Sequence, residues 1–171
     1  GVLRLLKEAR ANDLRLAIAT SSQLKNVTTL LDNNLPADWP AWFEVIATCD
    51  IIEQKKPSPA VYEYVMEQMN VTPEECVAFE DTYNGFIPGH EAGLQTVITT
   101  HFFTQGRDFT GSPLVLDSLG EPDQDFRITD ADPAIADDAE KTGHVDLNLL
   151  RQITLQANPV NRFEDDQSKC A

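Results

Sequence analysis

Three groups of polar residues each lie at the end of an apolar segment or at the start of a helical one. They are Thr20-Ser21-Ser22, then Lys56 before Pro57, and Glu80-Asp81. In a protein of net charge −15, a site for an anionic ligand must be made locally, by a cation, a metal or backbone amides. These three groups could form such a site if the fold brings them to one place.

Each group also has a structural explanation. Hydroxyl residues such as Thr20 to Ser22 commonly begin a helix by capping its first amides. Lys56 belongs to a residue type that is usually solvated at the surface. The acidic pair Glu80-Asp81 could be an ordinary turn after a strand. The three groups therefore point to a site only through their order and their setting.

The first 105 residues alternate between helix-like and strand-like patterns. Helices are expected at 1–12, 24–34 and 59–69, with a helical turn at 72–75, and strands at 14–19, 43–47, 76–79 and 95–99. Such alternation is typical of α/β proteins with a parallel sheet. Ligands bind such sheets outside the carboxyl ends of the strands, so the three groups are predicted to converge there.

The pattern changes after residue 105. Eight acids and one base lie between Glu121 and Glu140, with scattered prolines and little periodicity. We therefore expect residues 121–143 to form a long acidic surface excursion. A short helix is predicted at 146–153, so that residues 1–153 form one partial domain and residues 154–171 a polar tail.

Composition limits the class of protein. The 171 residues suffice for one domain with a hydrophobic core. The net charge of −15 disfavours nucleic acid as a partner, and no apolar run approaches the roughly 20 residues that span a bilayer. The three cysteines have no metal-binding spacing, which favours reduced thiols in the cytoplasm. We expect a cytoplasmic protein without nucleic-acid or membrane partners.

The order and setting of the three polar groups resemble the haloacid dehalogenase superfamily. Its second motif is a Thr or Ser after an apolar strand, its third a Lys often followed by Pro-x-Pro, and its fourth an acidic pair before a Gly-containing helix. The matching segments are residues 16–22, 55–59 and 77–85. Residues 97–122 and 145–150 also resemble the CbbY-like branch, which dephosphorylates sugar bisphosphates in photosynthetic carbon metabolism.

The resemblance implies a doubly wound parallel sheet and a Mg²⁺-dependent phosphatase of small sugar phosphates or bisphosphates. It also implies an aspartyl-phosphate intermediate, a monomer when complete, and a plastid location if the source is a photosynthetic eukaryote. By the same resemblance Thr20, the Ser21 amide and Lys56 bind the phosphoryl group, and Asp81 with Glu80 holds Mg²⁺. Lys55 fits less well, because the motif places the functional lysine directly before Pro57. Candidate substrate contacts are Ser22, Asn26 and Asn84.

Two parts of the family pattern are absent from the sequence. The Asp-x-Asp-x-Thr segment that carries the nucleophile should precede Gly1, and the cap domain that selects the substrate should lie between the first two motifs. We therefore expect a sheet without its central strand and a chain that is inactive by itself. Asp123-Gln-Asp125 and Asp130-Ala-Asp132 imitate the spacing but lack the following Thr, and they are interpreted as solvated loop acids.

Two other classes stay open at this stage. A receiver-like or flavodoxin-like module could take a phosphoryl group or Mg²⁺ on an acidic cluster without hydrolysing a metabolite. Asp50 is the candidate phosphate acceptor for that alternative, although the acidic pair Glu80-Asp81 comes late for it. The other class is a catalytically dead remnant that acts by association.

Overall fold

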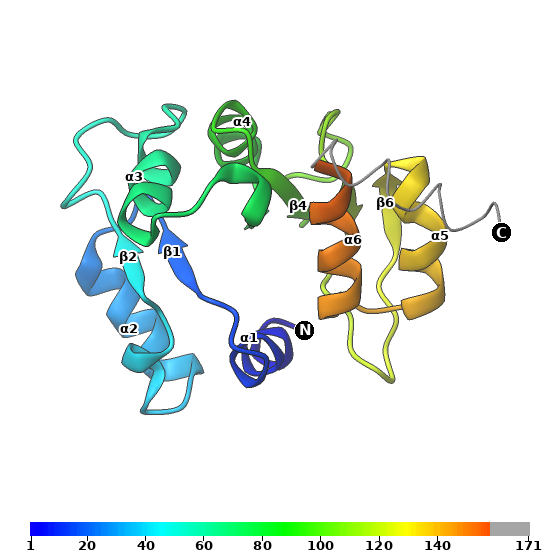
Figure 1. Cartoon of the computed structure of the whole chain (residues 1–171), viewed down its shortest axis with the longest axis horizontal. Helices are drawn as coiled ribbons and strands as arrows, with labels where there is room; N and C mark the ends of the chain where they lie inside the picture. The colour runs from blue at the N-terminus through cyan, green and yellow to red at the C-terminus, as the bar shows by residue number, and fades with distance from the viewer. Residues whose placement is uncertain (158–171) are drawn as a thin grey trace, which may run out of the picture.

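The structure is a computed structural model that describes residues 1–157 (Figure 1). The predicted polar tail from residue 158 onward, including Cys170, lies outside the described residues. The helices are α1 (Val2–Ala11), α2 (Leu24–Asn34), α3 (Ala60–Met69), α4 (Tyr83–Glu91), α5 (Pro133–Thr142) and α6 (Leu147–Ala157), with short 3-10 helices at Trp39–Ala41 and Pro73–Glu75. The strands are β1 (Ala17–Ala19), β2 (Val45–Ala47), β3 (Val77–Glu80), β4 (Gln95–Thr99), β5 (Leu114–Leu116) and β6 (Ile128–Ala131).

The strands form two separate sheets. β1 and β2 pair in parallel, and β3, β4, β5 and β6 follow one another in the larger sheet. Strands β3 to β5 are parallel, whereas β6 runs antiparallel to β5. Among residues 1–157, no backbone pairing joins β1 to β3. This agrees with the predicted α/β fold and with a sheet that lacks a strand between these two.

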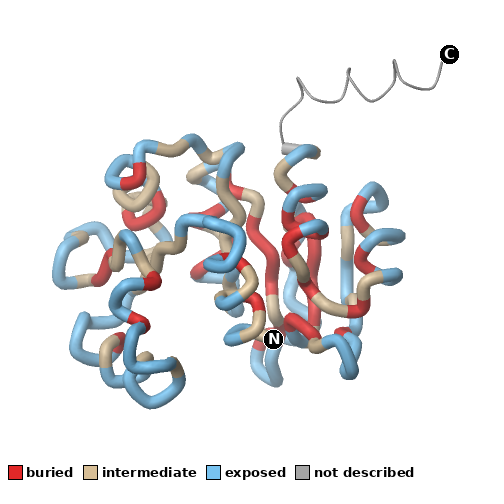
Figure 2. Tube along the Cα trace, turned by 60° about the horizontal axis from the view of Figure 1, so that its bottom comes forward, coloured by how far each residue is buried: buried red, intermediate tan, exposed pale blue. Residues whose placement is uncertain are grey.

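Helices cover both faces of the larger sheet. Neighbouring residues of β4 point to opposite faces, so that Val97 joins one core cluster and Ile98 another. Helices α1, α5 and α6 supply the first cluster, and α4 supplies Phe86 to the second. Figure 2 shows the resulting buried segments through the middle of the sheet. The doubly wound, Rossmann-like architecture follows from this arrangement.

Helix α3 joins the two sheets. Its buried Val61 and Tyr62 lie in a cluster that also contains Ala19 of β1, Ala47 of β2 and Ala78 of β3. Small side chains on the strands let the helix approach both sheets. The loop that leads into α3 carries Lys56, so this packing places the lysine between β1 and β3.

The elements predicted for the first hundred residues are confirmed, with small shifts at their ends. The short helix at Pro73–Glu75 begins with a capping box, in which the Thr72 amide donates to Glu75 Oε2 at 2.8 Å. Helix α4 contains a proline in its interior, because Pro88 is its sixth residue and is buried. Gly89 is needed beside it, because a Cβ there would lie 2.9 Å from Thr96 Oγ1.

The predicted acidic excursion at 121–143 is wrong. These residues contain β6 and α5, and Ile135 and Ala139 of α5 are fully buried. Helix α5 buries only a narrow apolar stripe, so its mainly acidic sequence did not show a helical pattern of apolar residues. Local signals were nevertheless present, since Asp132 caps the helix through the Ala134 amide and Gly143 ends it in a left-handed conformation. Helix α6 also extends past residue 153, so the predicted domain boundary is too early.

None of the helices in residues 1–157 has the length and apolar character needed to cross a membrane.

Candidate active site

Thr20 lies directly after β1 in a loop that does not cap the following helix. The Thr20 amide donates to Ala47 O at 2.9 Å, and its Oγ1 accepts from the Ser22 amide at 3.1 Å. Helix α2 is capped from elsewhere, because the Leu24 amide donates to Asp50 Oδ2 at 2.7 Å. The capping explanation of Thr20 to Ser22 is therefore wrong. Within the described residues the Thr20 hydroxyl donates to no acceptor, which leaves its hydrogen available to a ligand.

Lys56 forms a nearly buried ion pair with Glu80. Both side chains are only 12% exposed, and Lys56 Nζ contacts Glu80 Oε1. This pair overturns the explanation of Lys56 as a solvated surface lysine. A buried ion pair holds its two groups in a fixed geometry at a desolvation cost, which suits a site better than a surface.

Tyr62 contacts both members of the ion pair, and the sequence analysis did not identify it as a site residue. Its hydroxyl contacts Glu80 Oε1, lies 3.0 Å from Lys56 Nζ and 3.3 Å from Gly85 O. Lys56 Nζ also lies 4.7 Å from the centre of the Tyr62 ring. Burial raises the pKa of Tyr62, and the Glu80 carboxylate raises it further. The spacing of apolar residues in 61–69 predicts which face of this helix is buried. It does not predict that the Tyr62 hydroxyl on that face reaches Glu80.

The start of α4 fits closely around Glu80. Thr82 caps this helix by accepting from the Gly85 amide at 3.2 Å. A Cβ at Gly85 would collide with the Glu80 carboxylate, so glycine is required there by the close approach of this side chain. The glycine after the acidic pair thus has a structural cause in the position of Glu80.

Asp81 has a different environment from its neighbour. Its side chain is 62% exposed, and its Oδ2 lies 3.9 Å from His101 Nε2. The acidic pair is thus divided between a carboxylate engaged by Lys56 and Tyr62 and one that is open to solvent. Oxygen ligands and retained waters are what Mg²⁺ prefers, so Asp81 fits that ion.

The fit of Asp81 to Mg²⁺ is partial. No group of three or more His, Cys, Asp or Glu side chains that could hold a metal occurs in the described part of the chain. Asp81 would therefore supply one part of a coordination shell. Water, substrate or further protein groups must supply the rest.

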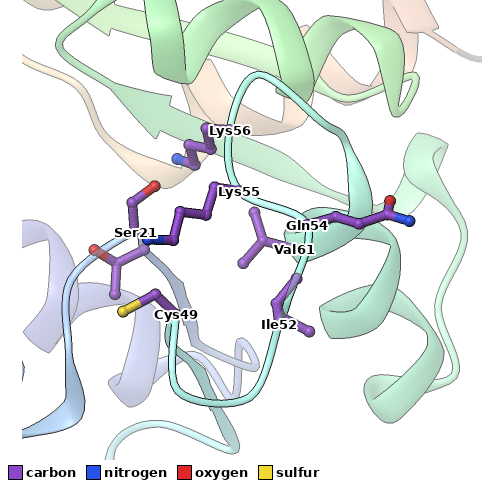
Figure 3. Close-up of a pocket in the computed structure, with 8 residues that line it drawn as sticks. Ser21, Cys49, Ile52, Gln54, Lys55, Lys56 and Val61 are labelled. Carbon is purple, nitrogen blue, oxygen red and sulfur yellow. The ribbon is translucent and has the colours of Figure 1, made fainter.

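A small cavity brings the first and second polar groups together. It is lined by Thr20, Ser21, Cys49, Ile52, Gln54, Lys55, Lys56 and Val61, and its volume is about 10 Å³ (Figure 3). That is about the space of one water molecule, so a phosphoryl group would lie at its mouth. With the Lys56–Glu80 pair, the cavity shows that all three predicted groups converge. Both lysines reach the cavity, although Lys55 is the more exposed of the two.

The remaining candidate residues lie on the rim. Ser22, Asn26 and Asn84 are exposed, and none of them lines the cavity. Asn26 lies in the first turn of α2 and Asn84 in the first turn of α4. Their roles as substrate contacts stay predictions.

The two Asp-x-Asp segments do not reach the site as a displaced nucleophile would. Asp130 lies in β6 opposite Val115, and Ala131 pairs with Leu114 at the amino end of β5. Asp132 follows at that same edge, whereas Glu80-Asp81 lie at the carboxyl end of β3. Asp125 packs against Gly143 at the end of α5. All four acids are exposed, as the interpretation as solvated loop acids expects, but Asp130 lies in a strand and Asp132 caps α5, so the loop assignment is wrong for these two.

The chain belongs to the family of haloacid dehalogenase-like hydrolases, whose pattern it matches over residues 1–99. It is 36% identical over 121 residues to the protein CbbY of Cereibacter sphaeroides, covering 71% of this chain and 53% of that protein. It is 30% identical over 108 residues to a phosphorylated carbohydrates phosphatase of Thermotoga maritima, covering 63% of this chain and 49% of that one.

Solved structures agree with this assignment. The crystal structure of CbbY from Rhodobacter sphaeroides with phosphate has a TM-score of 0.64 and 38% identity, over 69% of this chain and 52% of that one. A variant of the same protein, with the same similarity, was solved with xylulose-(1,5)bisphosphate. The predicted fold class and the CbbY-like branch are confirmed. This chain spans about half the length of the relatives it matches.

Proposed function

We propose that this protein, over its whole length, is a Mg²⁺-dependent phosphatase of small sugar phosphates or bisphosphates. The observation that carries the proposal is the convergence of Thr20, Lys56 and the pair Glu80-Asp81 at one edge of the sheets. The names of two relatives support the substrate class, since one acts on phosphorylated carbohydrates and another was solved with a sugar bisphosphate.

The residues of this chain divide the work on a phosphate monoester. The Thr20 hydroxyl and the Ser21 amide would donate to equatorial phosphoryl oxygens at the mouth of the cavity. The Lys56 ammonium would balance the negative charge that spreads over these oxygens in the transition state. Asp81 would hold Mg²⁺, which supplies further charge neutralisation when bound.

The attacking group is expected outside the described residues. In this proposal, an aspartate oxygen attacks phosphorus, and the bond from phosphorus to the sugar oxygen breaks as that oxygen takes a proton. Water then attacks the acyl phosphate and releases inorganic phosphate and the free carboxylate. A strand between β1 and β3, where the two sheets are not paired, would bring such a carboxylate to Thr20 and Lys56.

The receiver-like alternative lacks support from the site. Its candidate acceptor, Asp50, caps α2 through the Leu24 amide and also accepts from the Thr48 hydroxyl at 3.4 Å. This is a structural role within the loop. The family match over residues 1–99 also points away from a receiver.

The proposed function is tested by phosphate release from xylulose-1,5-bisphosphate and from a panel of sugar phosphates. We expect turnover by the full-length protein with Mg²⁺, and its loss with a chelator and return on adding Mg²⁺. Absence of phosphate release from every sugar phosphate would contradict the proposal, and so would turnover that is unaffected by the chelator.

A further inference from the structure

Three neighbouring groups hold the Glu80 carboxylate in place without a metal ion. Its carboxylate contacts the Lys56 ammonium and the Tyr62 hydroxyl, and its other oxygen faces Gly85 across a gap too small for a Cβ. Only 12% of its side chain is exposed. A carboxylate that is held by a cation and a hydroxyl donor has fewer lone pairs left for an additional ligand.

Tyr62 is built to hold this arrangement. It is 6% exposed and comes from α3, which bridges the two sheets. Its hydroxyl bridges Glu80, Lys56 and the backbone carbonyl of Gly85, and its ring lies under the Lys56 ammonium. The hydroxyl cannot point its single hydrogen at more than one acceptor, and the carboxylate is the stronger one. Its oxygen then remains free to accept from Lys56.

We propose that Tyr62 is a positioning residue that keeps Glu80 paired with Lys56, so that Mg²⁺ is bound by Asp81 and not by Glu80. This inference rests on the proposed function and deepens it, because it divides the acidic pair into two different roles. Glu80 fixes the cation that faces the phosphoryl group. Asp81, which is 62% exposed, is the carboxylate left for the metal.

The first test is Mg²⁺ binding by calorimetry on the full-length protein. We expect Asp81→Asn to weaken Mg²⁺ binding by more than about tenfold, and Glu80→Gln and Tyr62→Phe to change it by less than about threefold. The proposal is overturned if Glu80→Gln weakens binding as much as Asp81→Asn does. This measurement needs no turnover, so it separates this inference from a failure of the proposed function.

The second test is steady-state kinetics of Tyr62→Phe, which keeps the ring and removes only the hydroxyl. We expect kcat to fall about tenfold, as for one lost hydrogen bond to a charged group, with the Mg²⁺ activation constant unchanged. Tyr64→Phe on the same helix is the matched control, because the Tyr64 hydroxyl has no hydrogen-bond partner within residues 1–157. Normal kcat in Tyr62→Phe would overturn the proposal, as would a parallel rise in the Mg²⁺ constant.

Crystal structures of the wild type and of Tyr62→Phe with Mg²⁺ would show whether Tyr62 positions Glu80 or only supports the fold. In the wild type we expect Glu80 to remain against Lys56, and in Tyr62→Phe we expect this contact to loosen while the backbone of α3 and β3 is unchanged. A wild-type complex in which Glu80 has left Lys56 and coordinates Mg²⁺ would overturn the inference, whatever the activity.

Discussion

Lys56 has its ammonium fixed by Glu80 and Tyr62, which prepares it for charge stabilisation. Removing one preorganised group of this kind costs about 100- to 1,000-fold in rate. We therefore expect Lys56→Ala to lower kcat of the full-length protein by that factor while its circular dichroism spectrum stays native. Lys55→Ala, at the same cavity but without these contacts, should have a much smaller effect. Near-normal turnover of Lys56→Ala would remove this lysine from the mechanism.

Asp81 and Asp130 lie in different parts of the larger sheet and provide a matched pair of variants. Asp81 follows the carboxyl end of β3, whereas Asp130 lies in the antiparallel strand β6, opposite Val115 of β5. Asp81→Asn should raise the Mg²⁺ concentration for half-maximal activity more than tenfold, and Asp130→Asn should leave it unchanged. The measurement is activity against Mg²⁺ concentration. Matching curves for the two variants would refute the metal assignment.

At the scale of elements, α2 depends on a cap from a distant residue. Asp50 accepts from the Leu24 amide at the start of α2. Loss of a helix cap costs about 1 kcal/mol, which corresponds to a fall of about 2–4 °C in Tm for a protein of this size. Asp50→Ala is expected to show this fall in thermal denaturation, and Glu53→Gln in the same loop should not. An unchanged Tm in Asp50→Ala would show that α2 does not need the cap.

Arg15 links the residues just before β1 and β2 to the last residue of α3, at the end of these strands away from the candidate site. It donates to Glu44 Oε2 at 2.7 Å and to Met69 O at 2.7 Å. The hydrogen bond from Arg15 holds the pKa of the Glu44 carboxyl below its usual value of about 4.5. Because the folded pKa is lowered, this stabilisation is present above about pH 4.5 and is lost as the pH falls through the folded pKa.

This pKa shift predicts how the melting temperature changes with pH in mildly acidic solution. Between about pH 5 and pH 3, Tm of the wild type should fall more steeply than Tm of Glu44→Gln, which has no proton to gain. Arg15→Met should flatten the fall in the same way, because it removes the partner. Parallel Tm curves for all three proteins would show that the pair contributes nothing to stability.

At the scale of the whole molecule, β1 and β3 each have one edge without a strand partner in the described residues. Phe79 of β3 is 39% exposed, and unpaired apolar edges favour aggregation. We expect the 171-residue chain by itself to be of low stability and to release no phosphate from sugar phosphates, even with Mg²⁺. The two carboxylates at the site have other roles in this proposal, because Glu80 is paired with Lys56 and Asp81 is assigned to Mg²⁺.

The test compares this chain with a version extended upstream through any Asp-x-Asp-x-Thr segment in the coding sequence. Activity should appear only in the longer protein. Mg²⁺-dependent phosphate release by the short chain, abolished by Asp123→Asn or Asp130→Asn, would mean that the nucleophile lies in this chain after all.

The sequence alone determined the features that depend on neighbours along the chain. The Thr72–Glu75 capping box, the helix and strand order of residues 1–100 and the three polar groups could be read from short segments. The order of those groups also indicated the family, because each motif is contained within a few residues.

Only the tertiary structure decided how distant residues pair. Lys56 and Glu80 are 24 positions apart, and Tyr62 joins them only because α3 packs against both sheets. Helix α5 likewise depends on burial of Ile135 and Ala139 against the sheet, since its acidic exposed face dominates its local sequence. Short-range patterns record propensity, whereas these contacts arise from the packing energy of elements brought together by the whole fold.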